Sequence, residues 1–285
     1  MRRLITCATV AFLLLACLPT FAEDKITLDE LLQKHLDSIG SNEARLGTRV
    51  RAVNGKFKME VIQGGNDEAS GDAGVISAGK MMKLMMKTDS ARYAGEKFWY
   101  DGKHVVVPVS DVAARTYIAD FMYRNQPILR DGLFSGTVGT SWALLDVKDR
   151  GAKMIYDGIK TIDGQDLHQV TYVPKKSASE LEIHLYFDPQ TFRHVMTRYK
   201  FEVTGYLNVT PGIDRQARTQ NTGKTIYRLE EKFSDFHTTD GLTLPGTWDI
   251  RYSVEPVRPI LMHWTVNLTR VTSNPNVDLK AIFPE

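Results

Sequence analysis

The 285-residue chain carries 36 basic and 34 acidic residues, and its only two cysteines, Cys7 and Cys17, lie near its start. Without Arg2 and Arg3 the counts balance at 34 each, which gives no reason to expect nucleic acid or an anionic membrane as the main partner. Residues 23–285 contain no cysteine, so a disulfide, a thiolate nucleophile and a cysteine-ligated metal are excluded there.

The first 22 residues are predicted to be a signal peptide rather than part of the fold. An arginine pair precedes an apolar run from Leu4 to Ala16, which is shorter than the roughly 20 residues that a membrane-spanning helix needs. Cleavage after Ala22 would leave one folded domain, residues 23–285, free in the periplasm. As an alternative, the four residues that end at Cys17 resemble a lipobox, which would make the protein an outer-membrane lipoprotein. Both routes predict an exported protein.

The first predicted element is a helix that starts at a capping box, Thr27 to Glu30, and ends at Gly40. A strand follows over residues 50–62, then a polar glycine-rich turn over 64–74, then a second strand that continues to Lys87. This second strand is predicted to place five residues on one face: Ile76, Ala78, Met82, Leu84 and Met86. Further on, Asp101-Gly102 predicts a hairpin with a two-residue loop that pairs Phe98 with Val105.

Helical spacing replaces alternation between residues 110 and 150, where Tyr117 and Phe121, then Val138, Trp142 and Leu145 recur. Pro127 stands where a second helix would begin, so this part is predicted to form two or three short amphipathic helices. Strands resume afterwards and continue to the end. They are separated by Asp-Gly turns at residues 157–158, 163–164 and 240–241 and by a long polar loop over 204–224.

The clearest strand pair is predicted over Leu181 to Val203, where two alternating apolar runs flank an Asp-Pro turn. The register that puts both apolar sets on one face pairs Leu185 with Val195 and Glu182 with Arg198. Tight hairpins of this kind favour an antiparallel meander over βαβ units. The elements together predict a mainly β protein with an α lid. We expect one curved antiparallel sheet of about eleven strands, with the N-terminal helix and the mid-chain helices covering its concave face.

Catalytic motifs are absent from the sequence, and we predict that the protein is not an enzyme. The stretch GLFSG at residues 132–136 places its serine one position too late for a GxSxG elbow, and neither HExxH nor a P-loop occurs. His184 and His194 are expected to lie near each other on the outer face of the predicted hairpin. Because no carboxylate completes a ligand set on that face, neither a metal site nor a cofactor is predicted.

The predicted inner faces are rich in methionine and aromatic side chains. Residues 80–87 read KMMKLMMK, and methionine suits a surface that adapts to variable apolar shapes. A strongly curved sheet encloses more space than one helix and a short lid fill, which predicts an apolar ligand cavity. The candidate ligand-binding residues of cavity and lid are Met82, Leu84, Met86, Phe98, Tyr100, Phe121, Trp142, Tyr199, Phe201 and Trp264. The alternative for each of them is an ordinary core position.

Four stretches together resemble the LolA/LolB-like periplasmic lipoprotein carriers, which are unclosed β-barrels with a helical lid over an apolar cavity. These stretches are TLDELLQKHLDSIG, the mid-chain helical residues, LEIHLYFDPQTFRHVMTRYKFEV and FSDFHTTDGLTLPGTW. Members of this superfamily shuttle acylated proteins, bind lipids or sense envelope stress. The resemblance implies that the predicted sheet is an unclosed half-barrel. It also implies that a buried arginine holds the lid closed, and Arg49 and Arg51 are the candidates by position.

We therefore expect an exported envelope protein that binds the acyl chains of lipids or lipoproteins, for transport or sorting to the outer membrane. Its partners would be an acyl lipid or acylated lipoprotein and a membrane donor or acceptor protein. The main alternative is a lipid-responsive sensor or interaction protein of the same fold that carries no cargo. An enzyme whose groups assemble only on folding is the least favoured alternative.

Overall fold

The computed structural model describes residues 26–109, 115–175, 180–204, 224–255 and 259–284. The predicted signal peptide, the lipobox alternative and the interior of the predicted 204–224 loop lie outside these residues. The strands are β1 (Val50–Gln63), β2 (Glu68–Ala78), β3 (Met81–Thr88), β4 (Glu96–Tyr100), β5 (Val105–Val106), β6 (Lys153–Ile162), β7 (Gln165–Val173), β8 (Glu182–Phe187), β9 (His194–Thr204), β10 (Lys224–Ser234), β11 (His237–Thr239), β12 (Leu242–Leu244), β13 (Thr247–Glu255) and β14 (Ile260–Ser273). The helices are α1 (Leu28–Ile39), α2 (Asn42–Gly47), α3 (Tyr117–Arg124), α4 (Pro127–Arg130), α5 (Val147–Arg150) and α6 (Leu279–Ile282), with short 3-10 helices η1 (Gly136–Val138) and η2 (Ala143–Leu145).

Twelve of these strands form one antiparallel sheet in the order β5-β4-β3-β2-β1-β14-β13-β10-β9-β8-β7-β6. The chain meanders through β1 to β5, crosses through the helices, and meanders back from β6 to β14. The last strand then pairs with the first, β1 with β14. Because the outermost strands β5 and β6 do not pair with each other, the sheet stays open. The predicted unclosed half-barrel is confirmed, with twelve strands where about eleven were expected.

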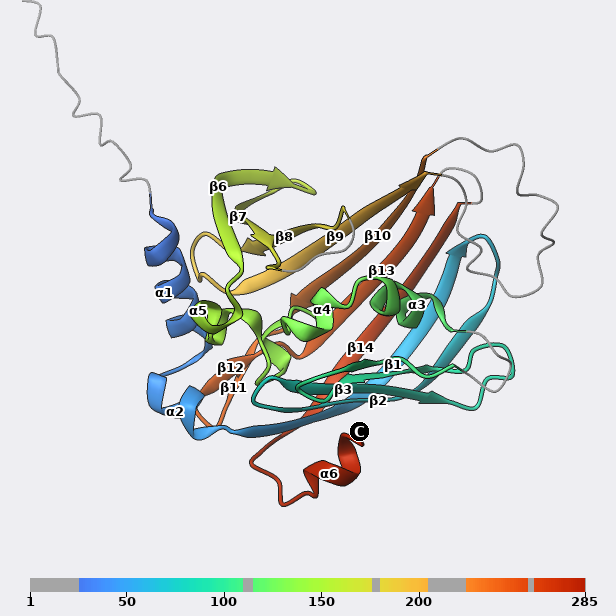
Figure 1. The fold of residues 1–285 in the computed structure, drawn as a ribbon, viewed down its shortest axis with the longest axis horizontal. Helices are drawn as coiled ribbons and strands as arrows, with labels where there is room; N and C mark the ends of the chain where they lie inside the picture. The colour runs from blue at the N-terminus through green and yellow to red at the C-terminus, as the bar shows by residue number, and fades with distance from the viewer. Residues whose placement is uncertain (1–25, 110–114, 176–179, 205–223, 256–258, 285) are drawn as a thin grey trace, which may run out of the picture.

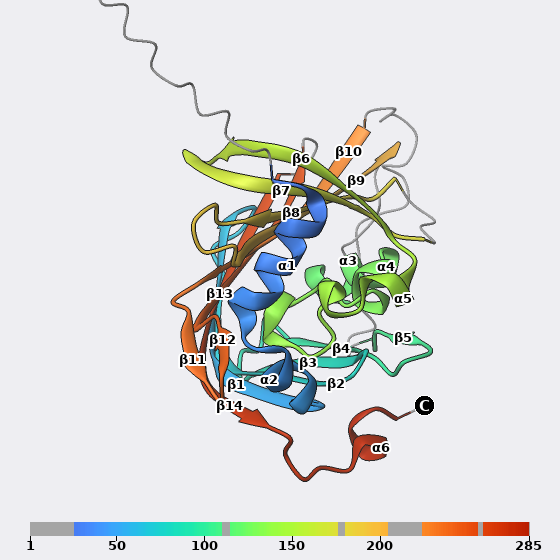
Figure 2. The same ribbon diagram turned by 90° about the vertical axis from the view of Figure 1, so that its left-hand side faces the viewer.

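The sheet curls around the helices α3, α4 and α5, which lie on its concave side, while α6 lies outside (Figures 1 and 2). We call residues 115–150 the helical block. Its interior is apolar and packs into one core cluster with the concave face of the sheet. A second, smaller cluster lies on the convex side and consists of Leu167, Tyr186 and Met196. None of the described helices is long and apolar enough to cross a membrane.

The N-terminal helix starts and ends as predicted. The Thr27 hydroxyl accepts a hydrogen bond from the Glu30 amide at 3.3 Å, and the Glu30 carboxylate accepts one from the Thr27 amide at 2.8 Å. This reciprocal pair satisfies two donors at the helix start, and the helix ends before Gly40. Pro127 also begins α4 as expected, because proline lacks the N–H that a first helical residue leaves unpaired.

Two predictions about residues 64–87 are wrong, because glycine in this stretch permits a close contact between two strands instead of forming a turn. The residues predicted as a turn over 64–74 mostly belong to β2, which begins at Glu68. A Cβ atom added at Gly71 would lie 1.9 Å from the Lys87 carbonyl oxygen, so glycine lets β2 and β3 approach there. The single strand expected to reach Lys87 is therefore two strands, β2 and β3. Ile76 belongs to the half-buried positions of β2, whereas Met82, Leu84 and Met86 are buried.

Turn predictions succeed where two consecutive residues adopt positive φ. Asp163-Gly164 and Asp240-Gly241 have φ values of 51° and 82° and of 51° and 73°, which suits tight hairpins. Residues 157–158 instead lie inside β6, where the pairing with β7 shifts at a bulge, so no turn forms there. At Asp101 the hairpin loop has four residues, because Tyr100, not Phe98, pairs with Val105.

The predicted register of the β8–β9 pair is wrong by two residues. Leu185 pairs with Thr197 rather than with Val195, and Glu182 pairs with Lys200 rather than with Arg198. A register shift next to Tyr186 and Phe187 inserts an extra residue, which changes the facing at the start of β9. His194 is consequently buried inside, at 1% exposure, and not on the outer face as predicted.

Candidate functional site

The interface between the concave face of the sheet and the helical block contains all the residues predicted for the cavity and lid. They come from β3, β4, α3, β9, β14 and the loop before η2, and none is more than 7% exposed. All belong to the same apolar cluster: Met82, Leu84, Met86, Phe98, Tyr100, Phe121, Trp142, Tyr199, Phe201 and Trp264. Chain segments more than 150 residues apart therefore meet at one apolar surface.

In this arrangement the apolar surface is buried, with side chains of the helical block packed against those of the sheet. The ring of Phe121 in α3 lies 5.2 Å from that of Phe201 in β9, and Phe134 lies 5.5 Å from Phe98 and 5.1 Å from Trp248. Such edge-to-face contacts are typical of a filled interior. Neither of the two pockets described below is lined by any of the ten predicted residues. Because the ten side chains are at most 7% exposed, a ligand could contact this surface only after packed side chains moved.

One of the two arginines proposed to hold the lid contacts the block. Arg51 in β1 is 3% exposed, and its Nη1 donates hydrogen bonds to the carbonyl oxygens of Thr137 at 2.9 Å and Val138 at 3.2 Å. Burial lowers the pKa of Arg51 to about 10. Arg49 is exposed, and its described hydrogen bonds are made by its backbone, with the Asn274 side chain and the Gly79 amide. The geometry thus assigns the contact with the block to Arg51.

A second contact joins the block to α1 through His35, which is fully buried. The Trp142 indole nitrogen donates to His35 Nε2 at 2.9 Å, and His35 Nδ1 lies 3.0 Å from the Phe192 carbonyl oxygen. Because indole N–H only donates, Nε2 must be the acceptor and the proton sits on Nδ1. Burial lowers the pKa of His35 to about 4, so the ring is neutral above that pH. The His194 ring stacks on Trp142 with 4.5 Å between the ring centroids and also lies 6.4 Å from the His35 ring.

A third contact uses a fully buried carboxyl group, Glu231 in β10. Its Oε1 accepts a hydrogen bond from the Ser135 amide and its Oε2 accepts one from the Tyr199 hydroxyl, both at 2.8 Å. Burial raises the pKa of Glu231 to about 8. Ser135 has a φ of 67°, a left-handed conformation that is uncommon for a residue with a side chain.

A fourth contact lies at the start of α3 and uses Glu96 in β4, which is 1% exposed. Its Oε1 accepts from the Tyr93 hydroxyl at 2.8 Å, and its Oε2 accepts from the Thr116 hydroxyl just before the helix. The Tyr93 oxygen in turn accepts from the Trp264 indole at 2.9 Å. Burial raises the pKa of Glu96 to about 7. We call the contacts of Arg51, His35, Glu231 and Glu96 the polar clamp.

The polar clamp holds the block with buried hydrogen bonds instead of strand pairing, and it is incompletely satisfied. Several fully buried polar atoms at this interface have no hydrogen-bond partner among the described residues: Arg51 Nε, Ser135 Oγ, Thr137 Oγ1, Ser141 Oγ and His194 Nδ1. Each such atom costs about 1–3 kcal/mol relative to a hydrated one. The closed arrangement is therefore less stable than its apolar packing alone would make it.

The buried acids of the clamp were not predicted, although the sequence contains a signal for them. Glu96 lies two and four residues before the inward-facing Phe98 and Tyr100, and Glu231 lies two residues from both Leu229 and Phe233. In a strand, residues two apart face the same side. A carboxylate in an otherwise apolar row of that kind indicates a buried acid. His35 shows the same pattern at helical spacing between Leu31 and Ile39.

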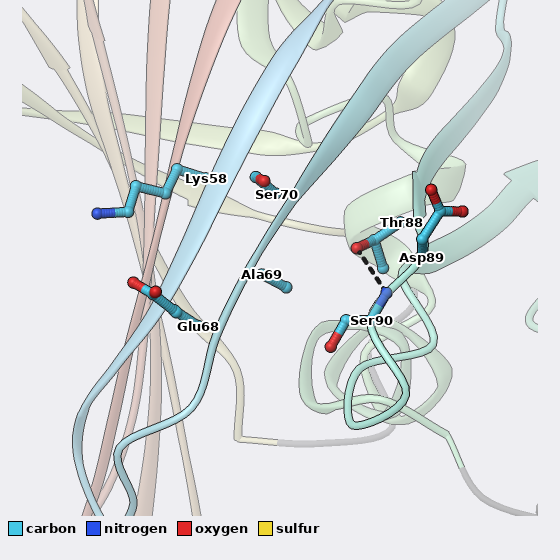
Figure 3. A pocket seen from close by; sticks show the side chains of 7 residues that line it. All are labelled: Lys58, Glu68, Ala69, Ser70, Thr88, Asp89 and Ser90. Atoms are coloured by element: carbon cyan, nitrogen blue, oxygen red, sulfur yellow. Dashed lines mark hydrogen bonds between the residues drawn. The ribbon is translucent and has the colours of Figure 1, made fainter.

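The first pocket lies away from the clamp, between β1, β2 and the residues after β3. It has a volume of about 550 Å³ and is lined by Lys58, Glu68, Ala69, Ser70, Thr88, Asp89 and Ser90. Figure 3 shows that its lining is mostly polar and holds one local hydrogen bond, from the Ser90 amide to the Thr88 hydroxyl at 3.2 Å. This pocket has no surface suited to an acyl chain.

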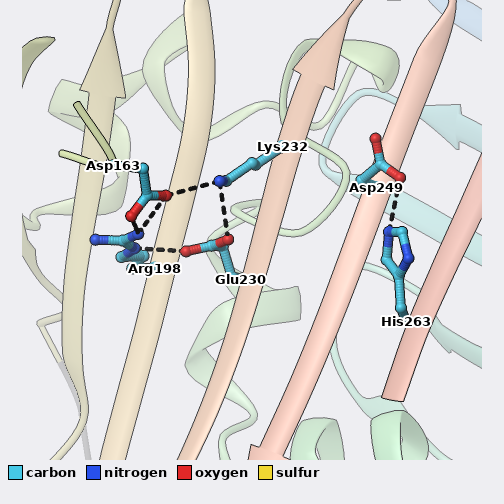
Figure 4. Close-up of polar contacts among 6 residues, drawn as sticks. All are labelled: Asp163, Arg198, Glu230, Lys232, Asp249 and His263. Atoms are coloured by element: carbon cyan, nitrogen blue, oxygen red, sulfur yellow. Dashed lines mark hydrogen bonds and ion pairs between the residues drawn. The ribbon is translucent and has the colours of Figure 1, made fainter. Parts of the chain in front are cut away.

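The second pocket is a groove of about 910 Å³ on the convex face. Leu167, Val195 and Met196 give it an apolar floor, and an ion network crosses the strands beside it. In this network Arg198 binds Asp163 at 2.9 Å and Glu230 at 2.5 Å, and Lys232 binds Asp163 at 2.7 Å (Figure 4). We call this pocket the outer groove.

Metal ligation has no candidate in the part of the chain that the structure describes, where no group of three or more His, Cys, Asp or Glu residues comes together. The two histidines predicted to neighbour each other lie on opposite faces of the sheet. His184 lies 3.1 Å from the Thr171 hydroxyl, whereas His194 faces the block. His263 on the convex face pairs with Asp249 at 2.8 Å (Figure 4).

Comparison with solved structures finds similar folds at low sequence identity. A LolA superfamily protein from Nitrosomonas europaea is 13% identical with a TM-score of 0.47, and the match covers 91% of this chain and 98% of that one. A putative outer membrane lipoprotein-sorting protein domain from Vibrio parahaemolyticus is 10% identical with a TM-score of 0.44, over 89% and 95%. A DUF1329 family protein from Desulfovibrio piger is 9% identical with a TM-score of 0.42, over 90% and 96%.

Two of these matches bear descriptions of the kind that the sequence resembles, a LolA superfamily protein and a lipoprotein-sorting domain. At TM-scores under 0.5 and identities of 13% or less, they say nothing about ligand or activity. No family model matches the chain, and no curated protein sequence matches it either.

Proposed function

We propose that this chain is an exported envelope protein that binds the acyl chains of lipids or lipoproteins between its concave sheet face and the helical block. Transport or sorting of such acylated molecules to the outer membrane is the role that this binding would serve. The observation that carries the proposal is the polar clamp. It attaches the block to a large apolar surface through a few buried side-chain contacts, and these can break without unpairing the sheet.

The energetics of an acyl chain suit such an exchange. Removing apolar surface from water stabilises by about 0.8 kcal/mol per methylene, so roughly ten buried methylenes supply about 8 kcal/mol. Lifting the block exposes the apolar residues that it covers, and an acyl chain on the same surface would cover them again. Hydration of the unpartnered atoms of Thr137 and Ser141 would lower the cost of opening further. Binding and release would then need no covalent chemistry.

A reversible disulfide between block and sheet tests this proposal. A Cβ atom built on Gly139 lies 3.5 Å from Cβ of Ser77 in β2, within the range of natural disulfides. Gly139 has a φ of −95°, which any residue adopts, so the double variant Ser77→Cys/Gly139→Cys keeps the backbone. Residues 23–285 contain no other cysteine. We expect the oxidised variant to lose binding of a fluorescent long-chain fatty acid and the reduced variant to regain it.

The single variants Ser77→Cys and Gly139→Cys are the matched controls, and both should bind in oxidised and reduced buffer alike. Equal binding by the oxidised and reduced double variant would show that the acyl chain does not enter beneath the block. Organic extraction of the purified protein, followed by mass spectrometry, gives an independent readout of bound lipid.

A lipid-responsive interaction protein is the second candidate function, and the outer groove favours it. This groove combines an apolar floor with charged residues on the face opposite the block. The same disulfide separates the two candidates. A carrier would capture an acylated protein only when the block is free. An interaction protein would bind a partner without acyl chains, with an affinity that differs between the locked and the free block.

A further inference from the structure

The loop 132–142, which joins α4 to η2, is the part of the helical block that contacts the sheet through most of the polar clamp. It begins at Gly132 and includes η1. Its polar contacts reach four different elements, with Arg51 in β1, Ser77 in β2, Glu231 in β10 and His35 in α1. These contacts decide whether the loop stays against the sheet.

The loop contains a residue in a strained backbone conformation and packs against buried polar atoms that lack a hydrogen-bond partner among the described residues. Ser135 keeps its left-handed conformation at 0% exposure, and its hydroxyl has no partner among the described residues. A Cβ atom at Gly136 would lie 2.8 Å from His194 Nδ1, so the loop packs tightly enough to leave that nitrogen unpartnered. Water would satisfy these atoms once the loop lifted. The closed loop therefore depends on the contacts that it does make.

Among those contacts, only the one at Ser135 is made by an acid. Glu231 is completely buried and forms no ion pair with any described residue. An ionised carboxylate at that position keeps its two hydrogen bonds but loses its hydration with no positive charge in exchange. A protonated carboxyl group avoids this loss. The closed loop therefore favours the protonated acid, and the lifted loop, which admits water, favours the ionised one.

We propose that Glu231 is a proton-controlled contact: when protonated it holds the loop 132–142 against the sheet, and when ionised it releases the loop. The proton leaves the carboxyl group for bulk water as the loop lifts and returns as the loop closes. This switch needs no lipid, so it goes beyond the acyl-binding function proposed above and can hold or fail separately from it.

The direction of the pH effect follows from the two states of the carboxyl group. Burial raises the pKa of Glu231 from 4.5 to about 8 in the closed loop, and exposure returns it toward 4.5. The closed state thus binds more protons between these pH values, and its advantage is complete below pH 4.5. As pH rises toward 8 the advantage disappears, and the opening equilibrium grows by up to about tenfold per pH unit.

Between pH 4.5 and about 8, the titratable groups that neighbour Glu231 do not change their charge. Burial lowers the pKa of His35 to about 4 and that of His194 well below its ordinary value, so both rings stay neutral. Burial raises the pKa of Tyr199 well above 10, and that of Arg51 falls only to about 10. Trp248 of β13 also faces Glu231 and does not titrate. Glu96, with a pKa of about 7, is the other acid that titrates, and it contacts the start of α3 instead.

Amide hydrogen exchange of the lipid-free protein between pH 5.5 and 7.5, corrected for intrinsic exchange rates, tests the switch. We expect protection of the loop 132–142 to fall at least tenfold over this range while that of β9 and β10 stays constant. Glu231→Gln, which keeps the size and an acceptor oxygen but does not titrate, should remove the fall. Glu96→Gln is the matched control, and in it the loop should retain its pH dependence.

A constant protection of the loop in the unmodified protein would overturn the proposal, as would an unchanged fall in Glu231→Gln. Should Glu231→Gln fail to fold, Tyr199→Phe provides a second variant. It removes one donor to the ionised form, so in exchange measured up to pH 9 the pH at which the fall levels off should lie higher than in the unmodified protein. An unchanged pH of levelling would also overturn the proposal. Because no lipid is present, a negative result here leaves the acyl-binding proposal to its own test.

Discussion

His35 offers the sharpest test of the interface, because its neutral form is required by two hydrogen bonds. Nε2 accepts from the Trp142 indole at 2.9 Å, and Nδ1 donates to the Phe192 carbonyl oxygen at 3.0 Å. A second proton on the ring would set an N–H group against the indole N–H. The perturbation is His35→Gln, which keeps an acceptor oxygen for Trp142 and does not titrate.

The magnitude follows from the pKa of His35, which burial lowers from 6.5 to about 4. Between these values the unfolded chain binds a proton that the folded protein does not. The stability due to the neutral ring is therefore present above pH 6.5 and is lost as pH falls toward 4. With 1.36 kcal/mol per pKa unit, the free energy of unfolding should fall by about 2 kcal/mol between pH 7 and pH 4.5 on account of His35.

The variant should behave differently at the two pH values. At pH 7 it loses the ring contact with Phe187, at 4.9 Å, and the bond to Phe192, which together cost about 1–2 kcal/mol. At pH 4.5 it avoids the cost of protonation, so we expect it to be as stable as the unmodified protein or slightly more stable. Ser38, whose hydroxyl lies 3.3 Å from the same carbonyl oxygen, helps to satisfy that oxygen in the variant.

Urea unfolding followed by far-UV circular dichroism at pH 7 and pH 4.5 measures this difference. The dependence on urea should be the same for both proteins, so that the midpoints report stability. Both proteins contain His194, whose own pH dependence largely cancels from the difference. A stability deficit of the variant that is equal at the two pH values would refute the neutral, doubly bonded His35.

The remaining predictions concern the clamp and the central hairpin. Arg51→Met removes two hydrogen bonds from a charged donor, worth about 1.5–3 kcal/mol each, so hydrogen-exchange protection of the loop 132–142 should fall at least tenfold. The control Arg49→Met changes an exposed residue and should leave this protection unchanged. Equal effects of the two changes would contradict the assignment of the contact to Arg51. Phe201→Ala should cost about 3–5 kcal/mol in urea unfolding because the ring is 3% exposed in the core. Glu182→Ala should cost under about 1 kcal/mol because its ion pair with Lys200 is exposed, and similar losses from the two changes would contradict the facing of this hairpin.

The elements that could be predicted from the sequence are those whose signal is local. The capping box at Thr27, the proline at the start of α4 and the alternation in Ile260 to Leu268 are properties of neighbouring residues, and the structure has each of them. Alternation also predicted correctly that Tyr199 and Phe201 face inward. Successive side chains of a strand point to opposite faces of the sheet, so the face of each residue can be predicted without knowing the partner strand.

Register could not be read in this way, because it depends on the partner. Pairing Leu185 with Val195 and pairing it with Thr197 place the same apolar set inward, so alternation does not distinguish a shift of two residues. The bulge beside Phe187 accounts for one residue of this shift and the turn before His194 for the other, and the change of facing at the bulge turned His194 inward. Similarly, Gly71 was predicted to belong to a turn but lies in β2, and only the approach of β3 shows why glycine is needed there.

The candidate site likewise has one part that the sequence predicted and one part that depended on tertiary packing. Alternation and composition predicted which methionine and aromatic side chains belong to one apolar surface, and the structure gathers all ten of them. Whether that surface is open or covered depended on the packing of residues 115–150 against strands distant in sequence. The polar clamp is of the same kind, since Glu231 and Ser135 are 96 residues apart and Trp142 and His35 are 107 apart.

By itself the sequence determined most of the strands and their inward faces, the two helical regions and the antiparallel class, because the period of the apolar residues and the tight turns between them carry that information. The tertiary structure alone decided the pairing of β1 with β14, the register of β8 on β9, and the closure of the block by buried Arg51, His35, Glu231 and Glu96. The physical reason is that burial and hydrogen-bond partners are set by which distant segments meet. A carboxyl group becomes a buried acid with a raised pKa only after those segments have excluded water from it.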